Sequence, residues 1–146
     1  MIINYFYESD FKINEESIYS DWIKAVFISE QKRFEEINYI FCDDEYLLRI
    51  NREYLDHDYY TDIITFDNSV SSLIMSDIYI SVERVKENAD DYGVDFINEL
   101  KRVMIHGVLH LCGYKDKAKE EQELMTAKEN EKLLMFHVEQ MKKEYV

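Results

Sequence analysis

Apolar residues recur along the chain with two different spacings, which separate predicted strands from predicted helices. Four short stretches rich in Ile, Tyr and Phe are typical of β-strands, namely residues 2–7, 37–42, 63–66 and 73–81. Between and after them, apolar residues return every three or four positions, as in the series Ile18, Trp22, Ala25 and Val26. This second spacing places the apolar residues on one face of a helix and therefore predicts α-helices.

The second predicted helix follows the 37–42 strand and has a start signal of its own. Asp43 or Asp44 is expected to cap it, because an Asp side chain accepts a hydrogen bond from the free backbone N–H groups at a helix start. The apolar members of this helix recur at helical spacing and are Tyr46, Leu47, Ile50, Tyr54 and Leu55.

Three further helices follow the last predicted strand. Gly93 interrupts a helical pattern over residues 82–92, and Gly113 ends a long helix over about residues 95–112. The final helix is expected over residues 119–141, and its apolar members include Leu124, Leu133, Leu134 and Phe136. The resulting order, βαβαββααα, predicts an α+β fold in which a small mixed four-stranded sheet packs with about five helices.

Length and composition favour a single domain over residues 1–146. Hydrophobic residues make up 47% and aromatic residues 14%, which is enough for a compact core. There is no proline and only 3 Gly, so each glycine is expected to mark a turn of the backbone. The two cysteines, Cys42 and Cys112, do not make a disulfide framework. With no signal-peptide pattern and no apolar run of bilayer length, the cytoplasm is the expected compartment.

The formal net charge is −14, from 31 acidic and 17 basic residues, and it argues against tight non-specific binding to nucleic acid. A local basic patch is still compatible with this balance. Five basic residues gather around the histidines described next, namely Lys101, Arg102, Lys115, Lys117 and Lys119. A solvated helix face followed by a charged loop explains this cluster equally well.

A dense group of chemically active side chains lies in residues 104–116, which read MIHGVLHLCGYKD. His106 and His110 are four residues apart on a predicted helix, so they share one face and can both reach one ion. The helix is apolar on nearly all other sides, which predicts a buried helix in which unpaired imidazoles are costly. Gly113 allows a left-handed turn that would bring Asp116 back toward the histidines.

Two imidazole nitrogens and one carboxylate oxygen would leave a fourth tetrahedral position open, as a catalytic zinc site requires. Zinc in such a site lowers the pKa of its water and stabilises charge on a phosphoryl oxygen. The sequence therefore predicts one zinc ion held by His106, His110 and Asp116 at the end of the buried helix, although these donors also suit other divalent metals. Two alternatives stay open: the histidine spacing also occurs in ordinary packing, and Asp116 is a possible helix cap.

The segment HGVLHLCGYKD resembles the signature of the YbeY family of bacterial endoribonucleases and rRNA maturation factors, usually H-G-x-L-H-L-x-G-Y-D-H. Residues 61–66, TDIITF, are similar to the family's T-D-V-L-S-F strand, and residues 76–81, SDIYIS, to its G-D-I-x-I-S strand. Ile50 and Asn51 match the family's L-N in the preceding helix. The resemblance spans roughly residues 47–134.

This resemblance implies metal-dependent cleavage of single-stranded RNA, used in processing the 3′ end of small-subunit rRNA and in ribosome quality control. The implied partners are rRNA and the ribosome or ribosomal proteins, with neither DNA nor a membrane expected. The resemblance leaves open whether a metal-bound water or the RNA 2′-hydroxyl attacks the phosphorus.

Two positions depart from the family pattern. The third family ligand is His, whereas this chain has Asp116, whose carboxylate is an ordinary zinc ligand. The family also carries an Arg, thought to act in the RNA reaction, at the position of Leu55, and Leu makes no charge-assisted contact with phosphate. Arg52, one helical turn earlier, or His57, in the following loop, is predicted to take over that role, although each also fits a solvated surface position.

Two other functions compete with RNA cleavage. The histidine spacing also resembles that of metzincin proteases, but those enzymes carry Glu directly after the first His, where this chain has Gly107. The second competitor is a non-catalytic factor that docks on the ribosome and uses the metal as a brace, which the acidic charge and Leu55 favour. Glu99, two turns before His106, is a candidate for orienting a metal ligand, although a surface salt bridge is its expected role.

Overall fold

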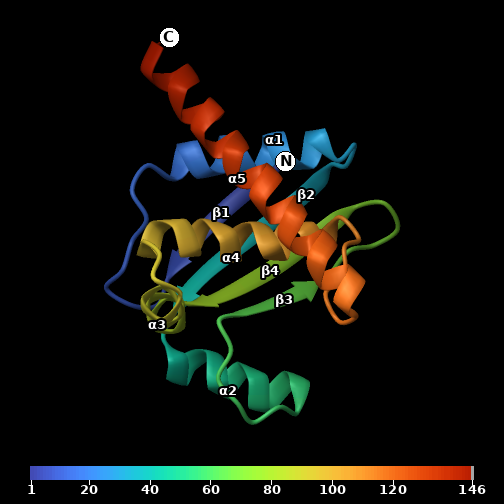
Figure 1. Ribbon diagram of the computed structural model, residues 1–146. Helices are drawn as coiled ribbons and strands as arrows, with labels where there is room; N and C mark the ends of the chain where they lie inside the picture. Colours follow the sequence, from blue (N-terminus) through green and yellow to red (C-terminus); the bar gives the residue numbers. More distant parts are fainter. Residues whose placement is uncertain (146) are drawn as a thin grey trace.

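The computed structural model describes the backbone of residues 1–145 and the side chains of residues 1–136. The elements follow one another in the predicted order, βαβαββααα (Figure 1). Their bounds are β1 (Ile2–Tyr7), α1 (Glu16–Ser29), β2 (Phe34–Cys42), α2 (Asp44–Leu55), β3 (Ile63–Asp67), β4 (Ile74–Ser81), α3 (Val82–Tyr92), α4 (Phe96–Leu111) and α5 (Lys119–Tyr145). The predicted boundaries differ from these by a few residues, and the largest differences are at the start of β2 and the end of α5.

The four strands form one mixed sheet in the order β1-β2-β4-β3. β2 pairs in parallel with both β1 and β4, whereas β3 pairs antiparallel with β4 and lies at the edge of the sheet. The α+β prediction, with its mixed four-stranded sheet and five helices, is therefore confirmed for the described part of the chain. The open flank of β3 faces the region where the candidate site is found.

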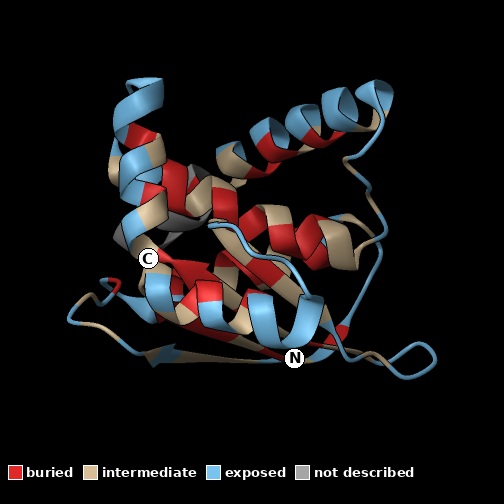
Figure 2. Ribbon diagram, turned by 90° about the horizontal axis from the view of Figure 1, so that it is seen from below, coloured by how far each residue is buried: buried red, intermediate tan, exposed pale blue. Residues whose placement is uncertain are grey.

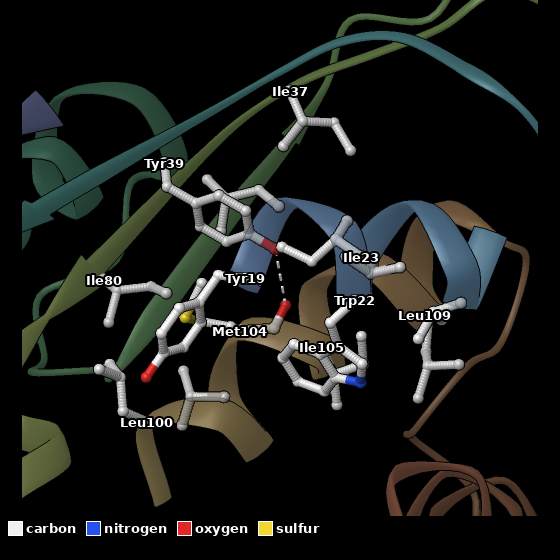
Figure 3. Packing of buried hydrophobic residues seen from close by; sticks show 14 of the residues in the cluster. Tyr19, Trp22, Ile23, Ile37, Tyr39, Ile80, Leu100, Met104, Ile105 and Leu109 are labelled. Carbon is white, nitrogen blue, oxygen red and sulfur yellow. Dashed lines mark hydrogen bonds between the residues drawn. The ribbon is translucent and has the colours of Figure 1, made fainter. Parts of the chain in front are cut away.

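The main core lies between the sheet and α1, α4 and α5. Inward residues of these elements are fully buried, among them Trp22, Tyr39 and Met104, and Figure 2 shows burial concentrated on the sheet and on the inner helix faces. The Tyr39 hydroxyl, on β2, donates a hydrogen bond of 3.1 Å to the Met104 carbonyl of α4 (Figure 3). Apolar burial and this bond hold α4 centrally against the sheet, as the sequence predicted for the histidine-bearing helix.

A smaller cluster forms on the opposite face of the sheet, where α2 packs against β3 and β4 through Leu47 and Ile64. Of the two predicted caps, Asp43 caps α2, because its side chain accepts a 2.8 Å hydrogen bond from the backbone N–H of Tyr46. Tyr54, which was predicted on the apolar face of this helix, is 66% exposed in its last turn.

The inward stripe of α5 is not the one that its leucines predicted. Leu124 and Leu134 are 50% and 69% exposed. The buried positions of this helix recur at intervals of four, three and four residues, and they are Met125, Glu129, Lys132 and Phe136. Two charged residues thus occupy core-facing positions: Glu129 contacts His106, and Lys132 forms an ion pair with Glu30. No helix in the described part of the chain is both long and apolar enough to cross a bilayer.

Candidate metal centre

Close contact between α4 and the edge strand sets the position of the site. Gly107 lies where a β-carbon would come within 3.0 Å of the Thr65 hydroxyl oxygen and 3.1 Å of the Ile63 methyl carbon. The absence of a side chain therefore lets α4 approach β3 closely, with His106 and His110 beside the sheet edge. A side chain at position 107, such as the glutamate that metzincin proteases carry there, would press against Thr65 and Ile63.

Three side chains converge at this edge, as predicted. The Nε2 atoms of His106 and His110 are 3.0 Å apart. The Asp116 Oδ2 atom lies 3.1 Å from His106 Nε2 and 3.3 Å from His110 Nε2. Among the side chains that the structure describes, these are the ones whose metal-ligating atoms all lie within 4.8 Å of one another.

The turn after α4 delivers Asp116 to the histidines. Gly113 has a φ of 106°, which L-residues with side chains rarely adopt. Its N–H donates to the carbonyl of His110, and the Tyr114 N–H donates to the carbonyl of Leu109. These bonds reverse the chain within one turn, which confirms the predicted role of Gly113.

Hydrogen bonds fix which nitrogen of each imidazole carries a proton. His110 Nδ1 lies 2.9 Å from the Tyr114 carbonyl oxygen, which only accepts, so Nδ1 donates. His106 Nδ1 lies 2.7 Å from a carboxylate oxygen of Glu129, which also accepts. In the neutral rings, both Nε2 atoms therefore carry lone pairs directed at the space shared with Asp116.

This donor set fits a divalent metal ion. Two lone pairs and a carboxylate oxygen face one another at 3.0–3.3 Å with no donor between them, an arrangement that is repulsive unless a cation or a proton joins them. Ligand atoms around a tetrahedral zinc are about 3.3 Å apart, given metal–ligand distances of about 2.0–2.1 Å. The residues at this site therefore match the ligands and spacing of a three-residue metal site.

The two histidine side chains are more exposed than the prediction of a fully buried helix implied. Their side chains are 23% and 32% exposed, because the His106–His110 stripe opens on a cleft instead of facing the core. Burial opposes the charged form of His106, but the hydrogen bond from its ring to Glu129 and the neighbouring carboxylates outweigh burial and raise its pKa.

Glu129 is a site residue that the sequence reasoning missed. Its side chain is only 9% exposed, and it bridges His106 Nδ1 and the Arg102 guanidinium, which donates a 2.8 Å hydrogen bond to the second carboxylate oxygen. A carboxylate behind a ligating histidine orients the ring and raises its basicity. One feature of the sequence could have indicated Glu129: it lies four positions after Met125 and seven before Phe136, and this spacing places it on the same face of α5 as these two buried residues.

Several predicted neighbours have other roles. Among the side chains of residues 1–136, Glu99 makes no salt bridge; it is 6% exposed and lines a second pocket. The basic cluster is not continuous, since Arg102 pairs with Glu129 and the Lys101 ammonium lies 3.7 Å from the centre of the Phe136 ring. Cys42 and Cys112 are free thiols outside the metal-ligating group, and burial raises the pKa of each, to about 12 for Cys42 and about 11 for Cys112.

The three converging side chains lie in a cleft of about 710 Å³ between the end of α4, β3 and the loop that follows α2. Leu55 and His57 line this cleft, and the His57 ring stacks on Tyr59 with centroids 5.1 Å apart. Arg52 does not line it; its guanidinium forms an ion pair with Asp58 on the exposed side of the loop. Lys117 also lines the cleft, next in sequence to the candidate ligand Asp116.

Known proteins share this chain's sequence over nearly its full length. The sequence model of the family described as Endoribonuclease YbeY matches residues 4–137. A protein named Endoribonuclease YbeY from Flavobacterium psychrophilum is 60% identical over 139 residues, covering 95% of this chain and 99% of the relative. The protein of the same name from Flavobacterium johnsoniae is 58% identical, with 95% and 100% covered.

The fold also has a counterpart among solved structures. The solution structure of TM1509 from Thermotoga maritima superposes with a TM-score of 0.65, covering 98% of this chain and 93% of that one. At 22% sequence identity, this likeness concerns the fold alone. The family match and the two Flavobacterium relatives decide the assignment, and they show that this chain belongs to the Endoribonuclease YbeY family.

Proposed function

We propose that the chain is a zinc-dependent endoribonuclease that cleaves single-stranded RNA in the cytoplasm, in maturation of the small-subunit rRNA 3′ end and in ribosome quality control. The observation that carries this proposal is the convergence of His106 Nε2, His110 Nε2 and Asp116 Oδ2 within an open cleft. The relatives named Endoribonuclease YbeY supply the reaction class.

His106, His110 and Asp116 would hold the metal, and Glu129 and the Tyr114 carbonyl would keep the imidazoles in the ligating tautomer. When bound, zinc would polarise a phosphoryl oxygen and lower the pKa of water. The chain's own residues would guide the RNA. The wall of the cleft carries the stacked His57–Tyr59 pair, on which a base could stack.

Positive charge for the phosphate is scarce on the protein itself. Lys117 lines the cleft, but Asp62, Asp67 and Asp116 line it too. Leu55 also lines the cleft, so the position where the family pattern has Arg faces the reaction space without a charge. Of the two residues predicted to replace that Arg, His57 has the better position because it lines the cleft, whereas Arg52 pairs with Asp58.

Leu55 also favours a second candidate function, a non-catalytic factor that docks on the ribosome and is braced by its metal. In this alternative the three ligands stabilise the turn after α4, and the cleft performs no reaction. The two functions differ in a single result: the alternative predicts no RNA cleavage by protein that demonstrably carries its metal.

RNA cleavage tests the proposal. A single-stranded fragment of the small-subunit rRNA 3′ end is incubated with zinc-loaded wild type, with His110→Ala, and with wild type plus chelator. We expect cleavage only by the loaded wild type, since His110→Ala removes one of three ligands. Equal cleavage in all three samples would reveal a contaminating nuclease, and none in any would support the docking factor. Cleavage that survives Arg52→Ala together with His57→Ala would remove both residues from the reaction.

A further inference from the structure

A second pocket, of about 620 Å³, opens on the other side of His106. It lies between the end of α3, the outer side of α4 and α5, and we call it the α3–α4 pocket. Asp62, Ile63 and His106 line both this pocket and the metal cleft. A molecule that occupies the metal cleft therefore has the α3–α4 pocket directly beside it.

The mouth of the α3–α4 pocket is apolar and aromatic. Tyr92, at the end of α3, is 67% exposed, and Val94 is 46% exposed. Both line the pocket together with Leu133 of α5. An exposed aromatic ring beside a hollow is a surface on which a planar base can stack.

The interior holds a carboxylate without a partner. Glu99 is 6% exposed and lines the pocket, yet within the described side chains it makes no hydrogen bond or ion pair. The other buried carboxylate there, Glu129, is already saturated by His106 and Arg102. Among the described residues only Arg84 Nε is a fully buried polar atom without a partner, so the Glu99 oxygens open on the pocket and can accept hydrogen bonds from a ligand there.

A metal ion is not the ligand that fits Glu99. The metal-ligating atoms that gather within 4.8 Å in the described part of the chain belong to His106, His110 and Asp116, and Glu99 is outside this group. A phosphate fits less well, because three carboxylates line the pocket, from Asp62, Glu99 and Glu129. Lys101 and Arg102 line it too, but Arg102 pairs with Glu129 and the Lys101 ammonium lies over the Phe136 ring. A neutral group with N–H donors satisfies the carboxylate without charge repulsion.

We propose that the α3–α4 pocket holds a guanine base of the RNA strand, with Glu99 accepting hydrogen bonds from its N–H groups and Tyr92 stacking on its ring. Guanine presents two adjacent donors, N1–H and the 2-amino group, which match the two oxygens of a carboxylate. Asn98, which lines the same pocket, offers an amide N–H for the guanine O6. This inference rests on the proposed function for its substrate class, single-stranded RNA.

Binding of RNAs that differ in one base tests the pocket separately from cleavage. Labelled single-stranded RNAs carry guanine, inosine or adenine at one central position and are otherwise free of guanine. Their affinities for the zinc-loaded chain are measured by fluorescence anisotropy, and gel electrophoresis confirms that the RNAs stay intact during the measurement. Wild type is expected to bind the guanine RNA about 10-fold more tightly than the adenine RNA, with inosine between, because each replacement removes a donor to a charged acceptor.

Variants assign the preference to residues. Glu99→Gln keeps the shape of the side chain and is expected to bring the three affinities within about 2-fold of one another. Tyr92→Ala should weaken all three RNAs by a similar factor, about 10-fold, because stacking is indifferent to base identity. Glu123→Gln, an exposed carboxylate on α5, removes the same charge and should leave the preference intact.

Equal binding of the three RNAs by wild type would overturn the proposal, as would a guanine preference that survives Glu99→Gln. Neither result depends on catalysis. A guanine preference in a protein that fails to cleave RNA would instead overturn the proposed function and leave the pocket assignment standing.

Discussion

The two imidazole rings of the metal centre are oriented by groups that lie outside their own helix. Glu129, from α5, holds His106 Nδ1 at 2.7 Å, and the Tyr114 carbonyl holds His110 Nδ1 at 2.9 Å. Each contact leaves an Nε2 lone pair directed at the shared position. Preset ring orientation strengthens metal binding, because the rings lose little freedom when the ion arrives.

Glu129→Gln tests this orientation. The amide is isosteric with the carboxylate but holds the His106 ring without a negative charge, so zinc affinity is expected to fall by about 10- to 100-fold. The measurement is competition for zinc with a chromogenic chelator, with circular dichroism to confirm folding. Exposed Glu123→Gln serves as the matched control on the same helix. Unchanged zinc affinity in Glu129→Gln would contradict a role in orienting His106.

The ligands and their support differ in how far the sequence could predict them. The shared face of His106 and His110 follows from helical spacing. The position of Asp116, six residues after His110, follows from Gly113, which reverses the chain between them. Glu129 is 23 residues from His106, and only the packing of α5 on α4 brings the two together. Local periodicity carries no information about such contacts between helices.

The element that ties the site to the rest of the fold is α5. Its Lys128 and Lys132 contact Glu30, just after α1, at 3.2 and 2.8 Å. The Tyr114 hydroxyl, from the turn whose carbonyl holds His110, donates to the same carboxylate at 2.6 Å. Glu30 thus joins the end of α1, the turn after α4, and α5 through one half-buried carboxylate.

Glu30 is expected to make the free energy of unfolding depend on pH in the acidic range. Burial raises its pKa, but hydrogen bonds from Lys132, Tyr114 and Lys128 outweigh burial and lower the pKa from 4.5 to about 2. A pKa lowered by folding contributes stability that is full above the unfolded value of about 4.5. That stability is lost as the pH falls from about 4.5 toward 2, where the folded chain takes up the proton.

Glu30→Gln is expected to lower the free energy of unfolding by about 2–3 kcal/mol at pH 7, because it also leaves the buried Lys132 short of a partner. Urea unfolding of wild type and variant between pH 7 and pH 2 measures the difference. It should shrink as the pH falls below about 4.5. A difference that stays constant over this range would show that the charge of Glu30 is not what stabilises the three elements.

Most elements of the fold follow from periodicity, and the exceptions have local causes. β2 begins at Phe34, before its predicted start at residue 37, because a register shift between Phe34 and Glu36 breaks the alternation that marks a strand. In α5, Glu129 and Lys132 occupy buried positions, so the leucines did not mark the inward face. The strand order β1-β2-β4-β3 depends on long-range pairing and was predicted only as a mixed sheet.

The charge of the whole molecule gives the proposed metal a central part in the proposed RNA binding. The chain carries a net charge of −14, and the metal cleft itself is lined by three aspartates and one lysine. A divalent ion at His106, His110 and Asp116 would place positive charge where a phosphate must lie. RNA cleavage is therefore expected to depend on site occupancy, instead of on a general attraction of the surface for nucleic acid.

Zinc titration of metal-free protein, with RNA cleavage as the readout, tests the proposed reaction most directly. Cleavage of the rRNA 3′-end fragment is expected to rise linearly and to reach a plateau at one zinc per chain. His110→Ala, titrated in parallel, should remain inactive throughout. Cleavage that is independent of added zinc, or no cleavage from wild type that has bound one equivalent, would contradict a metal-dependent ribonuclease.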